Sequence, residues 1–208
     1  MLNEATLKSA FLAVSQTMKQ NRDYLISLDQ RNGDGDLGIS MDEGFAAAFQ
    51  ALTLSSEADL GKLLVAAAKA FNEAAPSSLG TILSFMMMGM AKTLKGHETA
   101  DAALVGEALT AGVEKIMERA NSNPGQKTVL DALDPAVKAV CAHAPEGFKA
   151  AFAAASEAAK AGAESTKDMK AVHGRAAYYG DKAIGLVDGG AVAGSLLFEA
   201  LADAASNC

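Results

Sequence analysis

Hydrophobic residues recur along this chain at intervals of three and four positions, the spacing that places them on one face of an α-helix. In the first such segment, residues 5–19, Leu7, Phe11, Val14 and Met18 share a face. Comparable segments follow to the end of the chain, and none alternates apolar and polar residues as a half-buried strand does. The pattern therefore predicts an all-helical protein.

Polar and glycine-containing turns divide this pattern into about eight helices. Ser56 and Asp59 have the spacing of a capping box at a helix start. Pro76 ends that helix, and Ser77 or Ser78 caps the next one. Besides a short apolar segment at 24–28, the expected helices cover residues 5–19, 39–52, 56–75, 78–95, 101–120, 128 onward, 145–172 and 191–205.

Two residues inside these helices bear on how the helices pack. Pro135 lacks an amide hydrogen, so we expect it to kink or restart its helix. Gly162 lies within residues 145–172, where the absence of a side chain would let another helix approach closely. Because no internal repeat or interdomain linker is evident, residues 1–208 are expected to form a single domain, a bundle or barrel of antiparallel amphipathic helices.

Charge and composition narrow the classes of partner. The formal charge is −7, and the sequence has no run of Lys or Arg that could bind along a phosphate backbone. Nucleic acid is therefore not an expected partner. The most apolar stretch, residues 79–91, is shorter than the roughly 20 residues that span a bilayer. The N-terminus has no basic region before an apolar run, and Cys141 and Cys208 suggest no disulfide framework. We therefore expect a cytoplasmic protein without a membrane span.

The sharpest chemical signal is an acidic, glycine-containing loop at residues 29–38. It carries Asp29, Asp34 and Asp36, and its three glycines allow the backbone to fold tightly enough for the carboxylates to converge. Magnesium is commonly held by a few carboxylates together with substrate phosphates. Like charges repel at short range, so convergence favours a bound cation. A solvated acidic turn that caps the next helix explains the same residues.

A calcium-binding EF-hand loop is a further alternative. Positions 1, 3, 5, 8 and 12 of such a loop fall on Asn32, Asp34, Asp36, Ile39 and Glu43. The glycine that the sharp turn requires at position 6 is Leu37 here, and no second loop of this kind occurs in the chain. The spacing therefore favours magnesium over calcium.

Three loop segments carry motifs that occur together in one known family. The first is Leu28-Asp29-x4-Asp34-Gly35-Asp36-x-Gly38-x2-Met41. The second is Asn123-Pro124-Gly125-Gln126-Lys127-Thr128-x2-Asp131. The third is Gly174-Arg175-Ala176-x-Tyr178-x-Gly180, followed by Asp188-x-Gly190-Ala191. In this order and spacing the segments resemble the L subunit of dihydroxyacetone kinase, and the resemblance covers essentially the whole chain.

The resemblance implies a barrel of eight antiparallel helices that binds ADP or ATP across the loops at one end. Asp29, Asp34 and Asp36 match aspartates that hold two Mg²⁺ ions. The positions that match nucleotide contacts are Leu37, Gly38, Ile39, Ser40, Ser77, Ser78, Ala120, Val129, Arg175, Asp188, Gly189 and Gly190. Arg175 is the catalytic candidate, because a guanidinium suits a developing phosphoryl charge. Without the resemblance, a surface ion pair is the simpler interpretation of Arg175.

The resemblance also implies partners. In the family a K subunit holds dihydroxyacetone, and the L subunit presents the phosphoryl donor. In one version ADP stays bound and is rephosphorylated by a phosphohistidine on a third subunit, whereas in the other version ATP exchanges. We therefore expect a glycerone kinase-type phosphotransferase that is active with its partner and that could form a homodimer.

Four departures from the family pattern keep a second hypothesis open. Leu37 replaces the usual histidine and Ser40 the usual asparagine, while Ser77 and Ser78 stand in a segment that is commonly glycine-rich. Gly189 replaces a proline. The alternatives are a catalytically silent nucleotide-binding or regulatory paralogue, or a subunit of a kinase for another small sugar or polyol.

Overall fold

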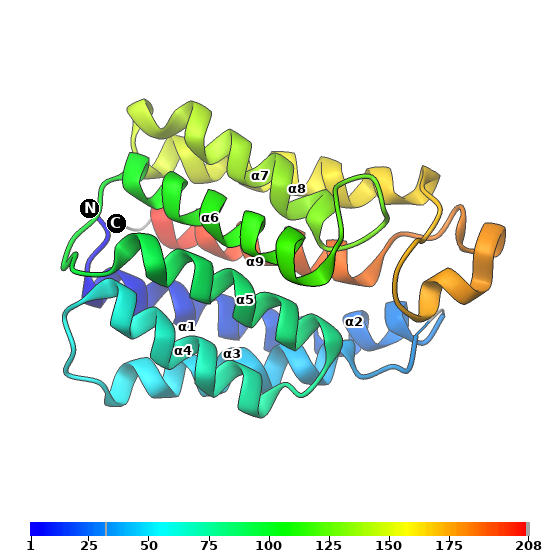
Figure 1. Cartoon of the computed structure of the whole chain (residues 1–208), viewed down its shortest axis with the longest axis horizontal. Coiled ribbons are helices and arrows are strands. Elements are labelled where there is room, and N and C mark those ends of the chain that lie inside the picture. The colour runs from blue at the N-terminus through cyan, green and yellow to red at the C-terminus, as the bar shows by residue number, and fades with distance from the viewer. Residues whose placement is uncertain (32, 207–208) are drawn as a thin grey trace.

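In the computed structural model, which describes residues 1–31 and 33–206, these residues form helices and no β-strand (Figure 1). The α-helices are α1 (Glu4–Gln20), α2 (Arg22–Asp29), α3 (Leu37–Leu54), α4 (Leu60–Ala74), α5 (Ser78–Leu94), α6 (Ala102–Ala120), α7 (Leu130–His143), α8 (Phe148–Ser165) and α9 (Gly189–Ser206). The 3₁₀ helices are η1 (Ala144–Glu146), η2 (Thr166–Asp168) and η3 (Arg175–Ala183). The all-helical prediction is confirmed.

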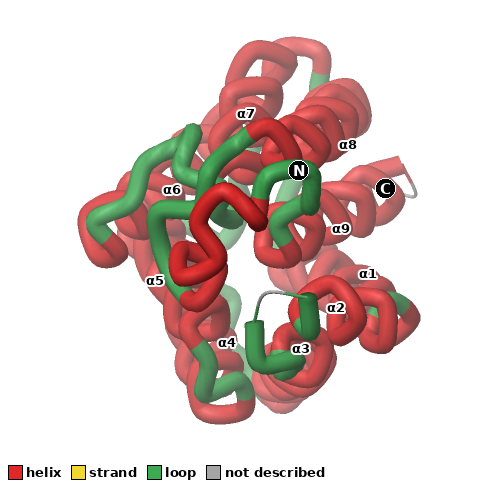
Figure 2. Tube along the Cα trace, turned by 90° about the vertical axis from the view of Figure 1, so that its right-hand side faces the viewer, coloured by secondary structure: helices red, strands yellow, loops and turns green. Residues whose placement is uncertain are grey.

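Eight of the helices form a closed ring, while α2 packs beside α3 at one end (Figure 2). Successive long helices are antiparallel neighbours from α3 to α9, α1 packs against α3, and α9 closes the ring against α1. Both termini lie at one end of the barrel, and the loops with the three sequence motifs gather at the other end (Figure 1). The up-and-down order therefore collects residues that lie far apart in sequence at one surface.

The apolar faces of the amphipathic helices meet inside this ring. Met18, Phe71 and Phe198 are completely buried, and the rings of Phe45 and Phe71 meet edge to face at 4.8 Å. Burying such a side chain stabilises the fold by about 1.5–3 kcal/mol. Within residues 1–31 and 33–206, no helix has both the length and the apolar character that crossing a membrane requires.

Two of the helix starts depend on single capping side chains. The capping-box prediction for Ser56 was wrong, because α4 begins at Leu60 and the Asp59 carboxylate accepts the amide of Lys62 at 3.1 Å. Ser77, rather than Ser78, caps α5, and its hydroxyl accepts the amide of Gly80 at 3.1 Å. Each such cap is worth about 1 kcal/mol.

The prediction of one long helix over residues 145–172 was also wrong. Gly147 has φ +92°, a left-handed conformation that cannot continue a helix, so α8 begins at Phe148. At the other end the Thr166 hydroxyl donates to the carbonyl of Ala163 at 2.6 Å, and the chain leaves the helix through η2. Alanine favours helix throughout this stretch, so composition conceals both ends.

A close contact joins α7 and α8 at the predicted position. Pro135 lies inside a continuous α7, so the helix tolerates it, and Gly162 of α8 packs against the carbonyl of Asp131. A Cβ atom on Gly162 would lie 2.1 Å from that oxygen.

We expect Gly162→Ala to lower the free energy of unfolding by about 2 kcal/mol, although alanine alone would raise it by about 1 kcal/mol through helix propensity. Urea denaturation measures this, and a more stable variant would contradict the contact.

Candidate functional site

A cleft of about 860 Å³ opens among the loops at the end of the barrel away from the termini. It is bounded by the acidic loop, the start of α5, the loop between α6 and α7, and the segment before α9. Nine of the twelve predicted nucleotide contacts line it, namely Leu37, Ser77, Ser78, Ala120, Val129, Arg175, Asp188, Gly189 and Gly190. Asp29, Asp34 and Asp36 line it as well. The fold thus brings the three motifs together.

The other three predicted contacts, Gly38, Ile39 and Ser40, lie in the first turn of α3 but not on the cleft wall. Gly38 faces α2, where an added Cβ would lie 2.1 Å from the carbonyl oxygen of Arg22. Ser40 is buried, and its amide donates to the carbonyl of Asp36 at 2.9 Å. Gly38 and Ser40 therefore pack against the protein, whereas Ile39 is exposed.

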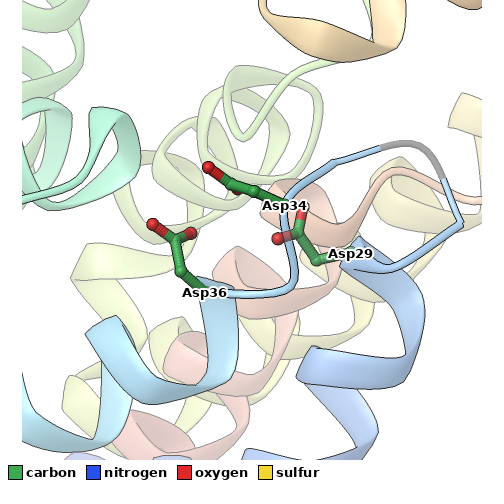
Figure 3. Close-up of side chains that lie close together, drawn as sticks. All are labelled: Asp29, Asp34 and Asp36. Carbon is green, nitrogen blue, oxygen red and sulfur yellow. The ribbon is translucent and has the colours of Figure 1, made fainter.

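The three aspartates converge at the mouth of the cleft (Figure 3). Each offers a carboxylate oxygen within 4.8 Å of the others. The amide of Gly35, which has φ +80°, donates to Asp29 at 2.7 Å and folds the loop back on itself. Burial, together with the charges of Asp34 and Asp29, raises the pKa of Asp36. The repulsion behind that shift is what a divalent cation would relieve.

The calcium-loop alternative does not match this cluster. Asn32, its first position, lies outside the described residues. Glu43, its last position, is exposed on α3 and does not belong to the carboxylate group, which contains Asp29 instead. The geometry therefore favours the aspartate arrangement over an EF-hand.

Arg175 reaches across the cleft to the acidic loop. Its guanidinium lies 2.7 Å from the Asp34 carboxylate, and both side chains are exposed, by 66% and 39%. An ion pair as open as this contributes little stability, which leaves Arg175 free to exchange partners. The structure shows the surface ion pair of Arg175, and its contact with phosphate stays a prediction.

The loop between α6 and α7 is shaped by the carboxylate of Asp131. It accepts the amides of Thr128, at 2.7 Å, and of Gly125. The cleft is also lined by polar residues for which no nucleotide contact was predicted, namely Asn72, Thr81, Ser122, Lys127, Thr128 and His173. Ser122, Lys127, Thr128 and His173 lie within or next to the motifs, whereas Asn72 and Thr81 are isolated polar residues without a distinctive spacing.

Asp188 begins α9 at the inner wall of the cleft. Its carboxylate accepts the amide of Ala191 at 2.8 Å, yet burial raises its pKa to about 6. Lys127 opposes that shift and Asp131 adds to it. Asp188 therefore caps α9, but burying its ionised carboxylate lowers the stability of the folded protein.

Because burying this charge destabilises the fold, we expect Asp188→Asn to raise the free energy of unfolding in a pH-dependent way. The asparagine keeps the helix cap but removes the charge. Above pH 6 the carboxyl of Asp188 is ionised in both the folded and the unfolded chain, so the folded protein bears the full cost of burying the charge. Near pH 4 the carboxyl is protonated in the folded protein, and this cost disappears. We expect the free energy of unfolding of the variant to exceed that of the wild type by on the order of 2 kcal/mol at pH 7.5, and by little at pH 4. Denaturation at both pH values measures this, and a pH-independent difference would contradict it.

Comparison with known proteins decides the family. The model of the DAK2 domain matches residues 32–203. The chain belongs to the DAK2 domain family. Within this family the ADP-binding subunit DhaL of PEP-dependent dihydroxyacetone kinase 1 from Listeria innocua is 32% identical over 89% of each chain. The corresponding ADP-binding subunit DhaL from Escherichia coli K12 is 27% identical over 88% of each chain.

DAK2 domains also occur within longer proteins. The dihydroxyacetone kinase of C. freundii, crystallised with AMP-PNP and Mg²⁺, superposes with a TM-score of 0.76 at 27% identity over 98% of this chain. The present chain spans 34% of the length of that kinase. The predicted resemblance and the predicted barrel are therefore both confirmed.

Proposed function

We propose that this chain is the nucleotide-binding subunit of a dihydroxyacetone-type kinase. It holds Mg²⁺ with ADP or ATP in the loop cleft and passes a phosphoryl group to a small keto-sugar on a partner K subunit. The observation that carries the proposal is the convergence of Asp29, Asp34 and Asp36 with Arg175 in one cleft. The AMP-PNP and Mg²⁺ in the C. freundii kinase support the choice of ligand.

The chemistry follows from charge and position. Asp29, Asp34 and Asp36 would hold Mg²⁺, two ions being our proposal, and the bound metal would offset the repulsion within the cluster and the charge of the phosphates. The start of α5 at Ser77 and Ser78 offers amides and hydroxyls to phosphate oxygens. Arg175 gives up Asp34 and stabilises the charge on the transferred group. Such transfer depends on positioning and needs no nucleophile on this chain.

The acceptor and the donor reside on partners. The relatives from L. innocua and E. coli, which this chain covers to 89% and 88% of their length, are named as subunits, which supports a keto-sugar site on a separate K subunit. Relatives from L. innocua and E. coli are named as subunits of PEP-dependent kinases, which supports a resident ADP recharged by a phosphohistidine subunit in the cytoplasm. Exchangeable ATP is the alternative donor.

The second candidate, a catalytically silent paralogue, rests on the departures from the family pattern. Two of these departures, Leu37 and Gly189, touch each other: a Cβ atom on Gly189 would lie 2.8 Å from Cδ2 of Leu37. The leucine thus fills space that a larger residue at 189 would need. A matched pair indicates a rebuilt cleft wall, and we therefore favour an active subunit whose sugar could differ from dihydroxyacetone.

The test is to denature the freshly purified protein, separate released nucleotide by chromatography and quantify the metal. Stoichiometric ADP with Mg²⁺ is the expected result and supports a resident cofactor. An empty protein that binds added Mg²⁺-ATP would indicate an exchanging kinase. An empty protein whose melting temperature is unchanged by either Mg²⁺-nucleotide would refute the proposed function.

A further inference from the structure

Lys127 is a buried cation in the wall of the cleft. Only 2% of it is exposed, and its ammonium donates to the carbonyls of Thr166 at 2.6 Å and Leu186 at 2.5 Å. Burial lowers its pKa, whereas the nearby carboxylates of Asp188, Asp131 and Asp168 act in the opposite direction. A lysine buried to this degree requires such partners, so its place in the fold is closely determined.

The two carbonyls that accept these bonds lie at the two ends of residues 167–186, which we call the strap. The base of the strap is closed further by the amide of Gly185, which donates to the carbonyl of Lys167 at 2.8 Å. The amide of Asp188 donates to the hydroxyl of Thr166 at 2.9 Å. One ammonium therefore fixes where the chain leaves α8 and where it returns to α9.

The strap carries Arg175 to the acidic loop. Between its base and Arg175 it has another tether, because His173 Nε2 lies 2.7 Å from Oε1 of Gln126. Gln126 precedes Lys127, so neighbouring residues of the loop between α6 and α7 hold the strap at two places. Lys127 itself has φ +59°, an uncommon conformation for a residue with a side chain. Observed strain of this kind is often tied to function.

We propose that Lys127 is a positioning residue that fixes both ends of the strap and so sets where Arg175 and Asp188 meet the bound nucleotide. The inference rests on the proposed function. Its ammonium already serves two carbonyls in a buried position, so it acts through the strap and not by touching the nucleotide. Lys127 belongs to the second motif, so the same contact links that motif to the segment that carries the third.

The test uses Lys127→Met in the full chain, with Lys160→Met, an exposed lysine of α8, as the matched control. Trypsin under native conditions reports on the strap, because Lys170, Arg175 and Lys182 are exposed there. We expect cleavage within the strap to be about 10-fold faster in Lys127→Met, since a charged hydrogen bond is lost. Cleavage at Lys69 in α4 should be unchanged, and the dissociation constant for Mg²⁺-ADP should rise about 10-fold.

Thr166→Val removes the acceptor for the Asp188 amide, keeps the lysine, and covers the case in which Lys127→Met does not fold. It should accelerate strap cleavage in the same direction. Wild-type cleavage in every folded variant would overturn the proposal, and so would lost Mg²⁺-ADP binding without faster cleavage, because the lysine would then contact nucleotide directly. If the wild-type protein binds no nucleotide, the proposed function fails, while the cleavage rates still decide whether Lys127 holds the strap.

Discussion

Replacing Asp34 with alanine is expected to abolish Mg²⁺-dependent nucleotide binding while leaving the fold intact. Asp34 lies on the exposed acidic loop, and its carboxylate is one of the three that converge within 4.8 Å. The variant should not lose stability, because the carboxylate has no buried contact and its repulsion of Asp36 disappears. Removing a residue that hydrogen-bonds to a metal ligand lowers metal affinity about 10–100-fold. Removing a ligand itself should therefore weaken Mg²⁺-ADP binding by at least about 100-fold.

Isothermal titration with Mg²⁺-ADP measures this effect, and urea denaturation checks the fold. Asp23→Ala is the matched control, since Asp23 is an exposed aspartate on α2 outside the carboxylate group. Its affinity should equal that of the wild type. An unchanged dissociation constant in Asp34→Ala would remove the acidic loop from the nucleotide site.

Arg175→Gln should reduce phosphoryl transfer by about 1,000-fold, the lower end of what an arginine at a transferring phosphoryl group contributes. Nucleotide affinity should fall far less, because the proposed cation ligands are Asp29, Asp34 and Asp36, which the variant keeps. The free-energy loss is thus confined mainly to the transition state. The fold should be unaffected, since 66% of the side chain is exposed and its ion pair with Asp34 lies at the surface.

The measurement is transfer to dihydroxyacetone in the presence of a K subunit, with the ADP dissociation constant determined in parallel. Lys182→Gln is the control, because it removes another exposed cation from the same strap. It should retain wild-type transfer. A variant of Arg175 in which affinity and transfer fall by the same factor would assign Arg175 to binding alone.

The elements of the fold followed from the sequence wherever side chains differ in polarity. The periodic apolar positions and the turn residues predicted the eight helices of the ring, whereas α2 was expected only as a short apolar segment. The prediction failed in the alanine-rich stretch that becomes α8, because alanine favours helix without marking a face or an end. There, the backbone conformation at Gly147 and the hydroxyl of Thr166 decide the bounds.

The acidic loop was recognisable by itself, because three carboxylates and three glycines within ten residues are an unusual local combination. The partners of that loop were not recognisable from local pattern. The pair formed by Arg175 and Asp34, and the contact of Leu37 with position 189, join residues about 140 to 150 positions apart. Only motif resemblance linked these loops before the structure placed them together.

Lys127 shows the same division most clearly. The sequence by itself determined the helices, the antiparallel order and the acidic loop, because these depend on local periodicity, turn chemistry and the charge of neighbouring residues. Closure of the barrel decided that Lys127 is buried between the ends of the strap, and that Asp188 is buried enough to raise its pKa to about 6. Burial and electrostatic environment are created by packing between distant segments, so the tertiary structure alone sets them.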